Sequence, residues 1–306
     1  MQLYRSAFLF LFAVLSFQAF GQDAPRTDEV KASPERATPR TVLTQNQIHE
    51  LIHQAADNDL LNNKAARNYA YIQREEEHRL DGNGEVKSTE TRTYEIMVLY
   101  DEPVRKQIEK NDKPLSEKDA RKEDEKIQKI IDKRKNESDG DRKKRLEKEE
   151  KDREQGREFV KEIDDAYNFR FVGNEQLEGR ETYIIDADPR PGFQPHMKGA
   201  KFLPKFRFRV WIDKAETQWV KVDIQCIDTV SIGLFLARIH KGSNIQIEQT
   251  RVNDEVWLPK RVTLKIGARI ALLKSLNLAE DVTYRDYKKF RANAKITGVG
   301  EVADPK

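Results

Sequence analysis

Alternation of apolar and polar residues is the strongest pattern in the second half of the chain. In 206–212, 220–226 and 262–266, every second residue is apolar and the residues between are mostly polar or charged. A period of two gives a β-strand one apolar and one polar face, which is typical of antiparallel sheets with one solvated side. These segments therefore predict amphipathic strands.

A hairpin is predicted near the beginning, where 68–80 and 85–100 flank Asp81-Gly82-Asn83-Gly84, residues that accept the positive φ angles of tight turns. The remaining predicted strands pair in order along the chain, at 168–174 with 182–188, 231–240 with 244–251, and 262–273 with 282–290. Roughly eight to eleven strands are too many for a flat sheet. They must curl into a barrel or half-barrel, or split into a sandwich.

Helical patterns occur in two places. Residues 44–57 carry apolar residues at helical spacing behind a capping threonine, which predicts a short amphipathic helix. In 101–165 charged residues and strong helix formers dominate, which predicts helices at 116–136 and 142–167. Apolar residues there are too sparse for a coiled-coil seam. We interpret 101–165 as a charged helical insertion, a solvated arm whose last turns dock on the sheet.

The N-terminal segment of the chain predicts export. Residues 1–21 combine Arg5, an apolar core over 7–17 and Ala19-Phe20-Gly21, as in a secretory signal peptide. The core is too short to span a bilayer, and no cysteine follows for lipid attachment, so no stable membrane anchor is expected. Residues 22–41 then read as a disordered linker, 42–295 as one domain and 296–306 as a polar tail. The periplasm is the expected location, with an extracellular one as the alternative.

Composition narrows the function. The single cysteine, Cys226, excludes an internal disulfide, so the fold depends on its packed core. Formal net charge is only +3 and both signs are interleaved, which argues against nucleic-acid binding.

One motif suggests catalysis. His49-Glu50-Leu51-Ile52-His53 matches HExxH on a predicted helix, where His49 and His53 could bind zinc with Glu50 as general base. No third ligand stands at a recognisable spacing, so two exposed polar residues on an amphipathic helix are the preferred interpretation. Nucleophile elbows and phosphate-binding glycine loops are absent from the sequence. We therefore expect a non-enzymatic protein without a cofactor.

Three short motifs carry a family resemblance: Val210-Trp211-Ile212-Asp213-Lys214, Glu255-Val256-Trp257-Leu258-Pro259 and Tyr284-Arg285-Asp286-Tyr287. Together with the helix at 44–57 and the long first hairpin, they resemble the outer-membrane lipoprotein-sorting family, the LolA-like periplasmic carriers. The resemblance covers about 42–100 and 169–290. It implies an α+β fold that is mainly antiparallel β, a curved half-open barrel with covering helices, and an apolar concave face that carries lipoproteins or other acylated molecules.

The leading hypothesis is thus a carrier or binder of lipoprotein acyl chains or another amphiphilic, lipid-like ligand. The alternation supplies the candidate cavity lining: Phe206, Phe208, Val210, Val220, Val222, Ile224, Val262, Leu264 and Ile266. An envelope scaffold that grips a protein partner through 101–165 is the first alternative. A zinc hydrolase using the HExxH motif is the second.

Overall fold

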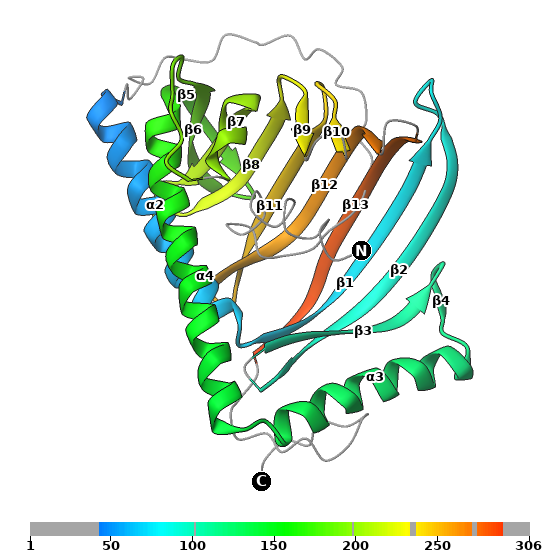
Figure 1. Cartoon of the computed structure of the whole chain (residues 1–306). Helices are drawn as coiled ribbons and strands as arrows, with labels where there is room; N and C mark the ends of the chain where they lie inside the picture. Colours follow the sequence, from blue (N-terminus) through cyan, green and yellow to red (C-terminus); the bar gives the residue numbers. More distant parts are fainter. Residues whose placement is uncertain (1–42, 101, 198, 233–236, 271–273, 290–306) are drawn as a thin grey trace.

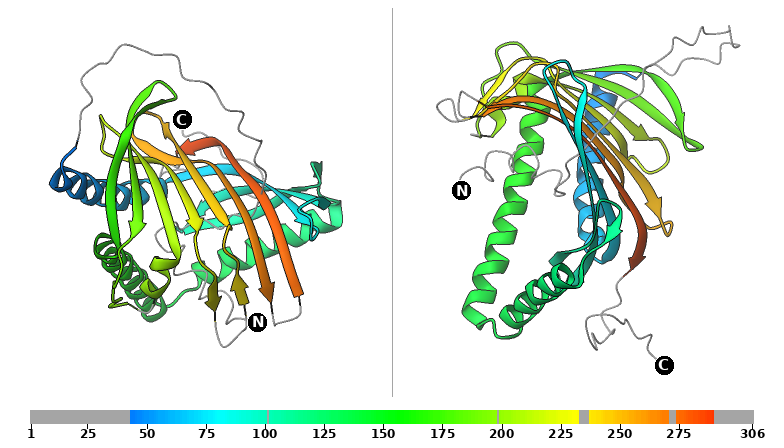
Figure 2. Two further views of the ribbon diagram at one scale, coloured as in Figure 1. Left: turned by 90° about the horizontal axis from the view of Figure 1, so that it is seen from above. Right: turned by 90° about the vertical axis from the view of Figure 1, so that its right-hand side faces the viewer.

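The computed structural model describes residues 43–100, 102–197, 199–232, 237–270 and 274–289. The predicted signal peptide, linker and polar tail all lie outside these residues. One antiparallel sheet runs through the described chain and curves strongly, with helices along it (Figure 1, Figure 2). The predicted fold class, mainly antiparallel β with covering helices, is confirmed.

The sheet is built in two blocks. The first comprises β1 (Tyr69–Leu80), β2 (Val86–Leu99), β3 (Glu102–Lys110) and β4 (Lys113–Pro114). The second comprises β5 (Tyr167–Leu177), β6 (Arg180–Pro189), β7 (Phe206–Asp213), β8 (Trp219–Cys226), β9 (Val230–Ile232), β10 (Ala237–Ile239), β11 (Asn244–Val252), β12 (Val256–Ile270) and β13 (Lys274–Lys289).

Strand order shows how the blocks join. The path is β4-β3-β2-β1-β13-β12-β11-β8-β7-β6-β5, so the first long strand pairs with the last. β9 and β10 lie off this path, with β10 paired to β9 and to the end of β12. The pairing predicted between 231–240 and 244–251 is therefore wrong, because β11 pairs with β8 and β12 instead.

Two helices pack on one side of the sheet, here called the inner face. α2 (Gln45–Ala66) begins at Thr44, which forms a capping box with Gln47. α4 (Asp139–Ala166) leads directly into β5, and the two helices bury an apolar cluster against β5, β6 and β7. The fully buried members of this cluster include Tyr167, Ile185 and Ile212. The short 3₁₀ helix η1 (Ala200–Lys205) completes it.

The segment 101–165 is only partly a helical insertion. Its first part forms β3 and β4, which extend the sheet beyond β2. The strand was missed because β3 carries few apolar residues. Its charged side chains find partners instead, Arg105 on Glu75 and Lys106 on Asp124.

α3 (Glu117–Lys135) is docked rather than free. Ile127 is 2% exposed and packs with Leu99 and Val104, on the face of β2 opposite to Ile96. The N-terminal part of α4 continues from the α3 corner toward β5 (Figure 1). Among the described helices, none is long and apolar enough to cross a bilayer.

Candidate ligand-binding face

A second apolar cluster covers the central strands on the inner face. Its buried side chains come from β1, β2, β7, β8, β9, β10, β11, β12 and β13. We call it the inner-face cluster; its buried members on the longer strands include Tyr71, Ile96, Phe206, Ile224, Cys226, Ile247, Val262, Leu264, Ile266, Leu278, Val282 and Tyr284. Phe208 packs against both this cluster and the one beneath α2 and α4, so the two are continuous.

Seven of the nine predicted lining residues meet in this cluster. Five are buried and two, Phe208 and Val222, are partly buried and pack against it. Val210 lies instead in the cluster beneath α2 and α4. Strict alternation along β7, β8 and β12 brings the seven together, because each strand presents every second side chain to the same side.

Val220 is placed on the opposite, outer face. The pairing of β7 with β8 steps from Trp211↔Lys221 to Ile212↔Trp219, so Val220 is the extra residue of a β-bulge. It packs with Trp211 and Trp257. A bulge shifts the alternation by one, and the sequence pattern carries no sign of it. Trp219 consequently points inward, where it packs against the inner-face cluster.

The motifs behind the family resemblance build the two faces of the sheet. Trp211 and Trp257 share the outer face, where the Arg180 guanidinium lies 5.0 Å from the Trp257 ring centre and bonds Asp213 at 2.7 Å. Tyr284 and Tyr287 lie on the inner face. Their rings stand 6.0 and 5.2 Å from that of Tyr71 on the neighbouring strand. Burial raises the pKa of all three inner tyrosines.

The second half of α2 is attached to the sheet by polar side chains. Asp59 accepts hydrogen bonds from Trp219 Nε1 (2.7 Å) and Asn63 (2.8 Å). Burial raises the pKa of Asp59 to about 6, while these hydrogen bonds oppose the rise. Asn62 pairs with the backbone of Trp257 in both directions, as a strand would. α2 is therefore a fixed cover over this end of the inner face.

The HExxH residues join α2 to α4. His49 Nδ1 lies 2.7 Å from one oxygen of Asp164, and His53 Nε2 lies 3.3 Å from the other. The Asp164 carboxylate of α4 thus contacts two histidines that lie one turn apart on α2. Glu50 accepts a hydrogen bond from Gln54 on its own helix. No group of three or more potential ligands in the described part of the chain is arranged to hold a metal ion.

A polar strip crosses the inner face beside the tyrosines. Glu75 on β1 accepts hydrogen bonds from Gln73 at 2.9 Å and Arg105 at 2.5 Å. The Arg105 guanidinium also lies 3.8 Å from the ring centre of Tyr94. Burial raises the pKa of Glu75, and Arg105 opposes that rise.

Glu280 lies in this strip and was missed from the sequence. It stands between Leu278 and Val282 on the inner side of β13 and is fully buried. The signal was present, since 276–284 alternates with an acid at an inward position. Because the last strand was predicted to begin at 282, the residue fell outside it.

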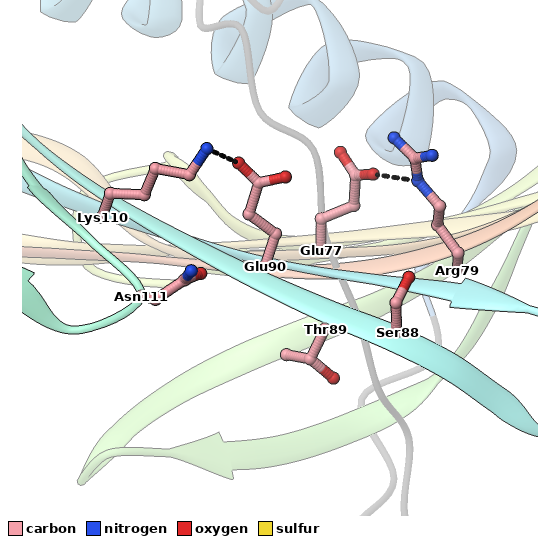
Figure 3. A pocket seen from close by; sticks show the side chains of 7 residues that line it. All are labelled: Glu77, Arg79, Ser88, Thr89, Glu90, Lys110 and Asn111. Atoms are coloured by element: carbon pink, nitrogen blue, oxygen red, sulfur yellow. Dashed lines mark hydrogen bonds and ion pairs between the residues drawn. The ribbon is translucent and has the colours of Figure 1, made fainter.

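A polar pocket of about 280 Å³ opens where β1 ends, β2 begins and β3 ends (Figure 3). It is lined by Glu77, Arg79, Ser88, Thr89, Glu90, Lys110 and Asn111. Its charged side chains pair with one another, Glu77 with Arg79 and Glu90 with Lys110, each at 3.1 Å. None of the predicted lining residues borders this pocket.

Comparisons with known proteins came from structure alone, since neither a family model nor a curated protein matches the sequence. A DUF1329 family protein from Desulfovibrio piger is 10% identical over 81% of this chain and 95% of its own, with a TM-score of 0.30. A putative outer membrane lipoprotein-sorting protein domain from Vibrio parahaemolyticus is 11% identical over 78% and 93%, with a TM-score of 0.27.

A LolA superfamily protein from Nitrosomonas europaea is 9% identical over 76% of this chain and 92% of its own, with a TM-score of 0.23. At these identities and TM-scores the likeness bears on neither ligand nor activity. Solved structures similar to this chain thus include proteins described by the family that its sequence motifs resemble.

Proposed function

We propose that this protein is a non-catalytic carrier or binder of an amphiphilic ligand, whose apolar chain lies along the inner-face cluster. The supporting observation is the extent of that cluster. It runs across both blocks of the sheet, whereas the buried strand residues of the cluster beneath α2 and α4 come only from β5, β6 and β7. Its buried members among the described residues all come from strands.

The physical basis is the burial of hydrocarbon. Each CH₂ group removed from water contributes roughly 0.8 kcal/mol, so a twelve-carbon chain gains on the order of 10 kcal/mol before the costs of binding. A curved sheet can surround such a chain without any reactive side chain. Seven of the nine residues predicted to line the site belong to the inner-face cluster.

The setting of this function follows from the sequence. We propose export by the signal peptide at 1–21 and action in the periplasm, where a lipoprotein or lipid-like ligand must cross water between membranes. An envelope protein would act as donor or acceptor of the ligand. The alternative function, an interaction module that uses 101–165, stays a prediction. Within this segment Ile127 packs α3 against β3, whereas the first turns of α4 extend beyond the sheet.

The first test is direct. Protein purified without detergent is extracted with organic solvent, and the extract is examined by mass spectrometry for lipid. The delipidated protein is then titrated with N-phenyl-1-naphthylamine, an uncharged fluorophore that brightens in apolar surroundings, and the fluorophore is displaced with dodecanol. We expect saturable binding and displacement.

A matched pair of variants locates the site. Leu264→Trp places a bulky ring in the inner-face cluster, whereas Leu146→Trp makes the same change at an exposed position of α4. Fluorophore affinity should fall at least about tenfold in the first variant and stay unchanged in the second. The proposal is overturned if the wild type binds neither probe, or if folded Leu264→Trp protein binds as the wild type does.

A further inference from the structure

Glu280 is a buried acid without a partner among the described residues. Its side chain projects from β13 into the inner-face cluster, with Leu264 of β12 on one side and Glu77 of β1 on the other in the strand register. The residue is 0% exposed, and neither carboxyl oxygen has a hydrogen-bond partner in the described part of the chain. Buried carboxyl groups in proteins are nearly always paired, so this one calls for an explanation.

Among the charged side chains around Glu280, there is one carboxyl group more than there are guanidinium groups paired with them. Glu75 is bonded by Arg105 and Glu77 by Arg79, so each of these carboxylates has its own guanidinium. Glu280 has none. Burial raises its pKa to about 10, the charges of Glu75 and Glu77 add to the rise, and Arg92 and Arg105 oppose it. The Glu280 carboxyl is therefore protonated at neutral pH.

We propose that Glu280 binds the ammonium group of a cationic amphiphile whose hydrocarbon chain lies on the inner-face cluster. This inference rests on the proposed function and specifies the ligand's chemistry. An ammonium group supplies the missing positive charge and up to three donors to the two unpartnered oxygens. The tail would lie over the apolar neighbours of Glu280, among them Leu264, Leu278 and Val282.

Binding would be coupled to the release of a proton. When the ammonium group arrives, the Glu280 carboxyl loses its proton to the solvent and the carboxylate pairs with the cation. Affinity for the cation should then rise with pH below the pKa of Glu280. Because the carboxyl is fully buried, a head group reaches it only when the side chains packed around it move apart.

The experiment compares three twelve-carbon probes by displacement of N-phenyl-1-naphthylamine: dodecylamine, dodecanol and dodecanoate, each below its micelle concentration. Wild-type protein should bind dodecylamine at least about tenfold more tightly than dodecanol, since a charge-assisted hydrogen bond is the stronger kind. Calorimetry in two buffers of different ionisation enthalpy should show proton release with dodecylamine and none with dodecanol.

Two variants make the same chemical change on opposite faces of the sheet. Glu280→Gln keeps the size of the side chain but cannot ionise, so it should lose the preference for dodecylamine and keep its affinity for dodecanol. Glu248→Gln removes a carboxylate that pairs with Lys221 on the outer face, and should keep the preference. Thermal denaturation establishes that each variant is folded.

The outcomes separate the two proposals. Equal affinity for dodecylamine and dodecanol, stronger binding of dodecanoate, or a preference retained by Glu280→Gln would overturn the ammonium site and leave the carrier function standing. Failure of all three probes to bind the wild type would remove the carrier function itself.

Discussion

At the scale of single residues, the pH dependence of stability should reveal Glu280. A free glutamate titrates near 4.5 and the buried one at about 10, so between these values the folded chain holds a proton that the unfolded chain has lost. The contribution of this group to stability is complete below about pH 4.5 and declines as the pH rises toward 10. The maximal slope is about 1.4 kcal/mol per pH unit.

We therefore predict that Glu280→Gln flattens the pH profile. Urea unfolding at pH 5, 7 and 9 should show the free energy of unfolding falling more steeply with pH in the wild type than in the variant. The variant should be the more stable protein at pH 9. Glu248→Gln should follow the wild type. Parallel profiles for wild type and Glu280→Gln would contradict the buried, protonated state.

Residue-scale prediction from the sequence succeeded where the strand period is unbroken. Val262, Leu264 and Ile266 share one face as alternation requires. Val220 does not, because one extra residue in β8 reverses the direction of the side chains beyond it. Whether a strand contains a bulge depends on its partner, which a local pattern does not specify.

At the scale of elements, the C-terminal part of α2 is stabilised by polar residues that the sequence pattern does not associate with a helix. The helix was predicted to end at 57 and continues to Ala66. Its extension contains Asp59, Asn62 and Asn63, residues of low helix propensity. Their side chains bond to the sheet and to one another. Tertiary contacts therefore stabilise a segment that is weak as an isolated helix.

The Asn62 contact gives a test of this attachment. Asn62→Leu should lower the free energy of unfolding by about 1–3 kcal/mol, because the N–H and C=O of Trp257 both lose their partner. The reciprocal change at the exposed neighbour, Leu61→Asn, should alter stability by no more than about 0.5 kcal/mol. Chemical denaturation measures both; equal effects would show that Asn62 does not hold the helix.

The docking of α3 can be tested separately. Ile127→Asp places a charge between the helix and β3, so α3 should detach while the rest of the sheet stays folded. Hydrogen exchange should accelerate in the α3 amides and stay slow in β1 and β13. Gln128→Asp adds the same charge on the exposed side of α3 and should leave exchange unchanged. Loss of protection throughout the sheet would contradict independent docking.

At the scale of the whole molecule, the pairing of β1 with β13 turns two blocks into one sheet. Three hairpins within the blocks, β1–β2, β5–β6 and β12–β13, were predictable from turns and alternation, whereas the β2–β3 hairpin was missed. The pairing of β1 with β13 was not predictable, because it joins residues some 200 positions apart and no local pattern in either strand specifies its partner. The curved shape was expected from the number of strands, which did not distinguish barrel, half-barrel and sandwich; only the family resemblance implied the half-open barrel.

One continuous sheet should unfold as one unit. Trp211, Trp219 and Trp257 all lie in the second block, on β7, β8 and β12, whereas β1 to β3 belong to the first block. We predict that urea transitions followed by tryptophan fluorescence and by the circular dichroism of the strands share one midpoint. Two separate midpoints would show that the blocks are independent domains joined at β1 and β13.

The position of Cys226 gives this protein a natural reporter. Its thiol is the only one in the chain, is 2% exposed and lies within the inner-face cluster, and burial raises its pKa. Alkylation therefore requires transient opening of the strands around Cys226, and the rate of labelling reports how often they open. A ligand bound on the inner-face cluster should slow the alkylation of Cys226. Ligand binding can therefore be followed from the labelling rate, without an attached dye.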